Sequence, residues 1–123
     1  MKILATDMDG TFLDHLGAYD KARLENLLDA CEAEDYVFTV ASGRALLALE
    51  ELFDGFVDRI AIIAENGALV QYKGEVLFES KLEPKDYLEI ADTTLALPTC
   101  EGILLSGRRG AYAPNDADPA YLK

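Results

Sequence analysis

Residues 2–14 read KILATDMDGTFLD, an apolar run that ends at two acidic residues, Asp7 and Asp9, two positions apart. The continuous apolar stretch at residues 3–5 predicts a parallel strand over residues 2–6 that is covered on both faces. Two carboxylates this close repel each other unless a cation neutralises them or one of them holds a proton. The pair therefore indicates a metal site or nucleophile-and-acid chemistry, with an acidic turn after a strand as the structural alternative.

Strands and helices alternate along the first 80 residues. Apolar spacing predicts helices over about residues 20–34 and 44–53, the second capped by Ser42 or Gly43, and strands over residues 36–41 and 59–64. Residues 68–72 and 75–79 flank Lys73-Gly74, which is typical of an antiparallel hairpin. This order predicts an α/β fold with a Rossmann-like, doubly wound parallel sheet, in which ligands bind beyond the carboxyl ends of the strands.

The pattern changes near residue 82, where the parallel arrangement gives way. Pro84 begins a predicted helix that ends before Pro98, and residues 102–107 and 110–114 predict two more strands. The last ten residues have the composition of a turn. We therefore expect two domains, residues 1–82 and residues 83–123.

Composition narrows the function classes. Eleven basic residues against 23 acidic ones give a net charge of -12, which disfavours binding to nucleic acids or to anionic membrane surfaces. No apolar stretch is long enough to span a bilayer, and acidic residues interrupt the N-terminus too early for a signal peptide, so the cytoplasm is the expected location. Cys31 and Cys100 share no metal-ligand spacing and are expected to be reduced thiols, and a single histidine excludes a two-histidine metal site.

Three polar segments follow the predicted parallel strands: DMDGT, SGR and ENG. They are expected at the same edge of the sheet. Ser42, with the backbone amides after it and the guanidinium of Arg44, could form an anion site, although a serine cap and a solvated arginine would also explain these residues. Asn66 lies in an Asn-Gly turn, which is a sufficient structural reason for it.

These segments resemble the signatures of a known family. DMDGTFLD is similar to the first motif, D-x-D-G-T-L-L, of the haloacid dehalogenase superfamily of phosphohydrolases, and VASGR resembles its second motif, a strand that ends in Ser or Thr. ENGALV resembles the segment at the third strand in the Cof-type branch of sugar and cofactor phosphatases. The resemblance covers residues 1–80 and extends more loosely into the start of an inserted α/β cap from about residue 82.

The resemblance implies a Mg²⁺-dependent hydrolase that acts on a small phosphorylated metabolite through an aspartyl-phosphate. It implies that Asp7 is the nucleophile and that Asp9 is the acid and base, with both residues at the metal. The residues it places around the phosphate and substrate are Gly10, Thr11, Ser42, Gly43, Arg44 and Asn66.

Two further family signatures are missing, a lysine and a late G-D-x-x-N-D segment. Lys81 and Lys85 fall at the junction to the cap, and Asn115-Asp116 follows Ala111-Tyr112 where Gly-Asp would be required. The resemblance therefore implies the first half of a longer phosphatase, whose first strand would present an open edge to a second chain or to another copy. Two alternatives stay open: a receiver-like phosphoacceptor, in which Glu65 would have to serve as the acceptor, and a non-catalytic binding remnant.

Overall fold

The computed structural model describes residues 1–114. The chain divides into two compact units, Met1–Ser80 and Lys81–Lys123. The tail with turn composition, apart from Pro114, and the Asn115-Asp116 pair lie outside the described residues. Each unit is described by itself.

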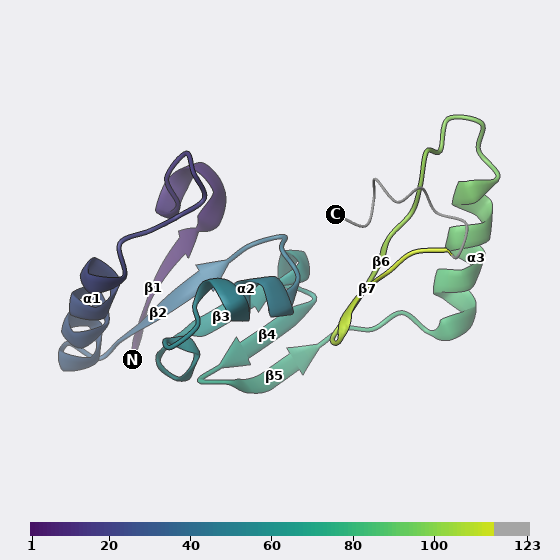
Figure 1. The fold of residues 1–123 in the computed structure, drawn as a ribbon. Coiled ribbons are helices and arrows are strands. Elements are labelled where there is room, and N and C mark those ends of the chain that lie inside the picture. The colour runs from purple at the N-terminus through teal and green to yellow at the C-terminus, as the bar shows by residue number, and fades with distance from the viewer. Residues whose placement is uncertain (115–123) are drawn as a thin grey trace. The chain divides into compact units, whose positions relative to one another are not determined.

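The first unit is built on a five-stranded sheet in the order β1-β2-β3-β4-β5 (Figure 1). The strands are β1 (Lys2–Asp7), β2 (Tyr36–Ala41), β3 (Ala61–Ala64), β4 (Leu69–Tyr72) and β5 (Glu75–Glu79). The first three are parallel, and β4 and β5 form the antiparallel hairpin expected around Lys73-Gly74. The α/β fold predicted from the sequence is confirmed.

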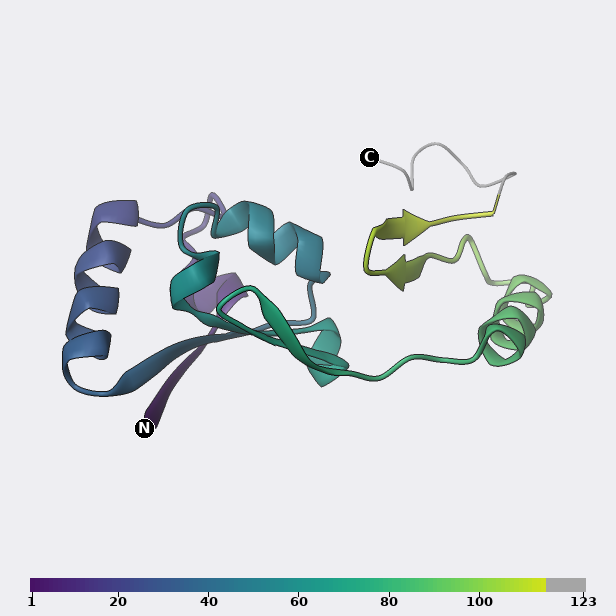
Figure 2. The ribbon, with the colours of Figure 1, turned by 90° about the horizontal axis from the view of Figure 1, so that it is seen from below.

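Two helices connect the parallel strands, α1 (Lys21–Ala33) and α2 (Leu46–Leu52). Both lie on the same side of the sheet (Figure 2), as right-handed connections between successive strands require. The helix α1 begins at Asp20, whose side chain accepts a hydrogen bond from the Arg23 amide at 3.0 Å. The core between helices and sheet is formed by Leu24, Leu28, Cys31, Phe38, Val40, Leu46, Leu49, Ile62 and Ala64.

The loop after β1 is anchored by its own apolar residues. Met8 is fully buried and Leu13 is nearly so, whereas Asp7 and Asp9 on either side of Met8 are exposed. The short helical turn η1 (Met8–Phe12) places Phe12 in a cluster of aromatic rings with Tyr19, Phe38 and Phe53. Burial of Met8 between them therefore leaves both carboxylates at the surface.

The first strand is less covered than its sequence predicts. The prediction of burial on both faces is wrong: β1 is an edge strand, and Ile3 and Leu4 are 65% and 40% exposed. Among residues 1–114, no strand pairs with its outer edge. The predicted open edge at KILAT is confirmed, and it is the physical reason for this exposure.

The second helix also begins later than predicted. It starts at Leu46 rather than Arg44, and its cap residue, Ala45, makes no side-chain hydrogen bond. The Ser42 hydroxyl accepts from the Arg44 amide at 3.2 Å, and the Arg44 carbonyl accepts from the Glu65 amide at 3.0 Å. Because these groups bond within the loop and to the neighbouring loop, residues 42–45 are held outside the helix. The third strand likewise starts at Ala61, after a short turn η2 (Val57–Arg59).

The second unit contains α3 (Pro84–Leu95) and a two-stranded sheet of β6 (Leu105–Gly107) and β7 (Gly110–Tyr112). Pro84 occupies the first turn of α3, where its missing N–H leaves no hydrogen bond unmade. Across the described residues, no helix is sufficiently long and apolar to cross a membrane.

Gln71 offers a test of how the core is packed. Its side chain on β4 is only 2% exposed, lies between Ile62 and Val76 in the sheet register, and its Nε2 donates no hydrogen bond. A buried donor without a partner is unfavourable, so Gln71→Met should raise the free energy of unfolding by about 1 kcal/mol. The matched control Gln71→Glu buries a carboxyl group at the same place and should lower the free energy of unfolding by at least about 2 kcal/mol. Urea denaturation measures both, and loss of stability in Gln71→Met would contradict this account.

Candidate functional site

The register of the parallel strands brings their carboxyl ends together. Asp7 lies opposite Ala41, and Ala41 lies opposite Ile63. The pairing continues into the loops, because the Ser42 amide donates to the Ile63 carbonyl at 2.9 Å and the Asn66 amide donates to the Ser42 carbonyl at 3.2 Å. The loops after β2 and β3 therefore form one connected backbone structure.

An open depression of about 370 Å³ lies over these strand ends. Four predicted site residues line it: Asp7, Ser42, Gly43 and Asn66. Three further residues that were not predicted as site residues complete the lining: Ala41, Ile63 and Gly67. The expected convergence of the three polar segments is thus observed. Gly10 and Thr11 are not part of the lining; they lie on the exposed turn η1, where Gly10 adopts a φ of 77° that allows the chain to turn.

Gly43 and Asn66 approach each other so closely that each limits the other. A Cβ atom at Gly43 would lie 2.8 Å from the Asn66 Oδ1 atom, a distance that real side chains do not adopt. The turn η3 (Glu65–Gly67) directs Asn66 there through three successive positive φ angles, 54° at Glu65, 55° at Asn66 and 95° at Gly67. Asparagine and glycine tolerate this conformation, whereas glutamate does so rarely. A strained turn with a specific side-chain approach is typical of functional loops.

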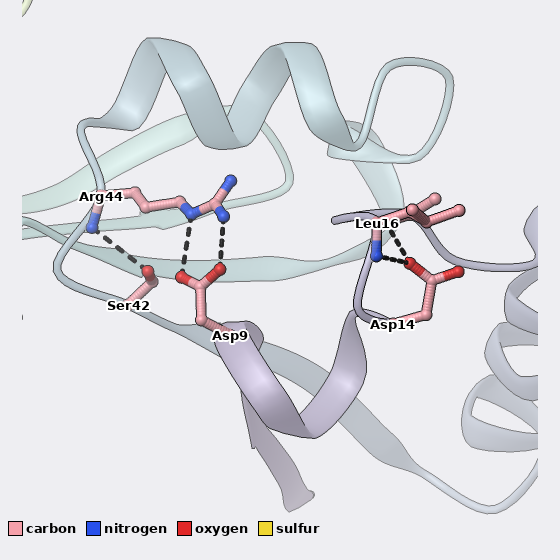
Figure 3. Close-up of polar contacts among 6 residues, drawn as sticks. Asp9, Asp14, Leu16, Ser42 and Arg44 are labelled. Carbon is pink, nitrogen blue, oxygen red and sulfur yellow. Dashed lines mark hydrogen bonds and ion pairs between the residues drawn. The ribbon is translucent and has the colours of Figure 1, made fainter.

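Asp9 and Arg44 form an ion pair next to Ser42, a residue of the lining (Figure 3). The guanidinium donates through Nε to Asp9 Oδ2 at 3.1 Å and through a terminal nitrogen to Oδ1 at 2.5 Å, so the pairing is two-pronged. The hydrogen bond from Arg44 lowers the pKa of the Asp9 carboxyl group, and the same bond raises the pKa of the guanidinium. The sequence did not indicate this pair, because its members are 35 residues apart.

The remaining carboxylate of the first motif has a structural role. Asp14 Oδ1 accepts hydrogen bonds from the amides of Leu16 at 2.8 Å and Ala18 at 3.0 Å, and so closes the turn that follows η1 (Figure 3). It points away from Asp9 and Arg44. In DMDGTFLD, Asp7 and Asp9 therefore belong to the site, and Asp14 stabilises the loop.

The donors at the site fit part of a magnesium shell. Mg²⁺ takes six oxygen ligands but is commonly held by only one or two carboxylates, with water and substrate phosphate completing the shell. Asp7 offers an exposed carboxylate at the depression, and Asp9 lies two residues away. Within residues 1–114, no cluster of three or more His, Cys, Asp or Glu side chains could hold a metal ion. The chain therefore supplies two possible acidic ligands and leaves the others to water, substrate or further protein groups.

Comparison with known proteins identifies the family. Residues 4–122 match the family model described as haloacid dehalogenase-like hydrolase. The chain belongs to this family. The assignment confirms the resemblance seen in the first and second sequence motifs, and it places the chain in a family of hydrolases.

Several members resemble the chain along nearly its whole length. The 5-amino-6-(5-phospho-D-ribitylamino)uracil phosphatase YbjI of Escherichia coli is 32% identical over 98% of this chain, which corresponds to 44% of YbjI. The crystal structure of SMU.1108c from Streptococcus mutans is 30% identical, with a TM-score of 0.87, over 98% of this chain and 46% of that protein. The fold of the sugar phosphatase BT4131, of subclass IIB, is also similar, with a TM-score of 0.62 and 23% identity over 90% of this chain and 43% of that one. The chain spans less than half the length of each of these relatives.

The contact between Gly43 and Asn66 makes a prediction about the site's geometry. Gly43→Ala should displace the Asn66 side chain from the depression, because the new methyl group and Oδ1 cannot occupy the same space. The free energy of unfolding should change by less than about 1 kcal/mol, since the group that must move is the end of a surface side chain. Side-chain amide NMR of Asn66 measures the displacement. Backbone amide signals of the loop after β3 allow the comparison in Asn66→Ala, where Gly43→Ala should shift them little; equal shifts in both backgrounds would show that Asn66 is not the limiting contact.

Proposed function

We propose that this chain carries one part of the active site of a Mg²⁺-dependent phosphate-monoester hydrolase that acts through an aspartyl-phosphate. The observation that supports the proposal most directly is the depression itself. A carboxylate, a hydroxyl group and an amide side chain, from Asp7, Ser42 and Asn66, border one open space at the ends of parallel strands. Such a set offers a nucleophile together with hydrogen-bonding groups for an anion.

In this mechanism an oxygen of Asp7 attacks phosphorus, and the bond from phosphorus to the leaving oxygen breaks. Asp9 gives a proton to the leaving alcohol and later takes a proton from the water that hydrolyses the aspartyl-phosphate. Mg²⁺, held by Asp7 and Asp9, would screen the negative charge of the phosphate against that of the nucleophile. Gly10 and Thr11 would bind the phosphate only if the exposed turn η1 folds toward it.

Ser42 is well arranged to hold a phosphoryl oxygen. Its hydroxyl oxygen already accepts a hydrogen bond from the Arg44 amide. A hydroxyl group has one hydrogen to donate, and that hydrogen is not needed for this contact. Ser42 can therefore donate to a phosphoryl oxygen, with the Gly43 amide next to it as a second donor.

The substrate we propose is a small phosphorylated metabolite, a sugar phosphate or a cofactor precursor. Two named relatives support this class, since one is described as a phosphatase of a phosphoribitylamino-uracil and the other as a sugar phosphatase. We further propose that residues 1–82 are the first part of the hydrolase core and that residues 83–123 begin an inserted cap. Both assignments rest on the family membership and on the change of pattern near residue 82.

Substitution of the proposed nucleophile tests this function. Asp7→Asn should reduce Mg²⁺-dependent hydrolysis of p-nitrophenyl phosphate by about 10³-fold or more, because the amide cannot form the covalent intermediate. Asp58→Asn, at an exposed position of η2 outside the lining of the depression, is the matched control and should leave the rate unchanged. Hydrolysis that does not depend on Asp7 would overturn the mechanism. Phosphorylation of the chain without turnover would favour a phosphoacceptor, and the absence of both reactions even when further polypeptide completes the sheet at β1 would favour a binding remnant.

We also propose that the outer edge of β1 pairs with a strand that residues 1–114 do not provide, either from further polypeptide or from another copy. The edge carries exposed apolar side chains, with Ile3 65% exposed, and the relatives are more than twice as long as this chain. An uncovered apolar edge strand is a template for pairing. Completion of the sheet at β1 would also bring new side chains next to Asp7.

Self-association of the full chain tests the β1 edge. Sedimentation velocity should show concentration-dependent association, and Ile3→Lys should shift the chain toward the monomer, because a charged edge residue disfavours strand pairing. Leu77→Lys is the matched control on β5, at the other edge of the sheet, where Leu77 is 62% exposed. A stable monomer at all concentrations, or an equal effect of both substitutions, would contradict a specific role for β1.

A further inference from the structure

Arg44 and Asp9 neutralise each other in the structure, although the proposed function requires Asp9 for proton transfer and the family resemblance places Arg44 beside the phosphate. Both oxygens of the Asp9 carboxylate accept hydrogen bonds from the guanidinium. In that state each Asp9 oxygen has one lone pair engaged by the guanidinium, and the carboxylate is oriented toward Arg44 instead of toward a leaving group. The guanidinium, for its part, presents to Asp9 the donors that would otherwise bind a phosphoryl group.

We infer that Arg44 is an exchangeable clamp, which holds Asp9 while the site is empty and moves to the phosphoryl group of an incoming substrate, so that substrate binding itself releases Asp9. This inference rests on the proposed function and deepens it. It assigns to one side chain both the recognition of the phosphate and the control of the proton-transfer group.

The strength of the ion pair allows such an exchange. The side chain of Asp9 is 66% exposed and that of Arg44 is 37% exposed, so water screens their attraction. Exposed ion pairs contribute little net stability. A phosphate monoester carries nearly two negative charges and several acceptor oxygens, and arginine binds such groups with the same two-pronged geometry that it uses for a carboxylate. The phosphate can therefore compete with Asp9 for the guanidinium.

The backbone around Arg44 restricts the exchange to its side chain. The Arg44 amide is bonded to the Ser42 hydroxyl and its carbonyl to the Glu65 amide, so the main chain is held on both sides. Gly43 before it lines the depression, and Ala45 after it is the cap residue of α2. Rotation of the long side chain from Asp9 toward the neighbouring depression requires no rearrangement of the loop.

Arg59 provides an internal comparison. It also donates two hydrogen bonds to carboxylates, to Glu32 at 2.8 Å and to Asp29 at 2.7 Å. Both partners lie on α1, and none of the three residues borders the depression. This cluster ties α1 to η2, the turn before β3, and no ligand at the site would displace it. Arg44 therefore represents an ion pair at the site, and Arg59 represents one that only supports the fold.

Titration of the full chain with inorganic phosphate, followed by NMR, tests the clamp. The Nε–H signal of Arg44 and the carboxyl carbon of Asp9 should shift together along one binding curve, while the Nε–H signal of Arg59 stays in place. In Asp9→Asn, the Nε–H signal of Arg44 reports a side chain that has lost its charged partner. Phosphate binding should shift the Arg44 signal of the unaltered chain in the same direction as this substitution does.

Affinity gives a second, independent readout. Arg44→Gln should weaken phosphate binding about tenfold, and Arg44→Lys should weaken it less, because it keeps the charge but not the two-pronged geometry. Arg59→Gln should have no effect on binding. Phosphate that binds while the signals of Arg44 and Asp9 stay unchanged, or with equal affinity in Arg44→Gln, would overturn the clamp and leave the proposed function intact. Failure of phosphate to bind at all would overturn the clamp, and the Asp7-dependent hydrolysis described above reports on the proposed function separately.

Discussion

The parallel register of β1, β2 and β3 is the constraint on which the site depends. It sets Asp7 beside Ala41 and Ala41 beside Ile63, so that the loops after the three strands begin at the same level. Packing against the helices fixes this register, because Val40 and Ile62 point into the core and are completely buried. A shift of the strand register by one residue would turn these side chains toward the face of the sheet opposite α1 and α2. It would also move Asp7 away from the depression. The position of the carboxylate therefore follows from the packing of the core.

The parts of the fold that sequence could predict are those determined by local pattern. The apolar runs that became β2 and β3, the Lys73-Gly74 turn and the helical spacing of α1 each carry their information within a few residues. The start of α2 does not, because the bonds that keep residues 42–45 out of the helix involve Glu65 on another loop. The burial of β1 was also beyond reach, since it depends on which strand, if any, lies at its outer edge.

The candidate site divides in the same way. Motif spacing was sufficient to bring Asp7, Ser42, Gly43 and Asn66 to one place, because strand ends in a parallel sheet share an edge. What spacing could not show is that Gly43 and Asn66 depend on each other. SGR and the Asn-Gly turn each have an ordinary local explanation, yet the backbone at Gly43 leaves no room for a Cβ because Asn66 is there. Long-range contacts of this kind are decided by the tertiary fold, as is the ion pair between Asp9 and Arg44.

Charge sets the last requirement on this site. The chain as a whole is strongly acidic, with a net charge of -12, and the proposed substrate is an anion. At the site itself the Arg44 guanidinium is paired with Asp9, and the two donors used in that pair cannot bind a phosphate at the same time. If Arg44 moves to the phosphate, Asp7 and Asp9 are left as two close negative charges, which is the arrangement that a divalent cation stabilises. Arg44 keeps Asp9 neutralised while the site is empty. Asp7 and Asp9 would hold the proposed Mg²⁺, and its charge would compensate the two carboxylates once the guanidinium has moved to the phosphate.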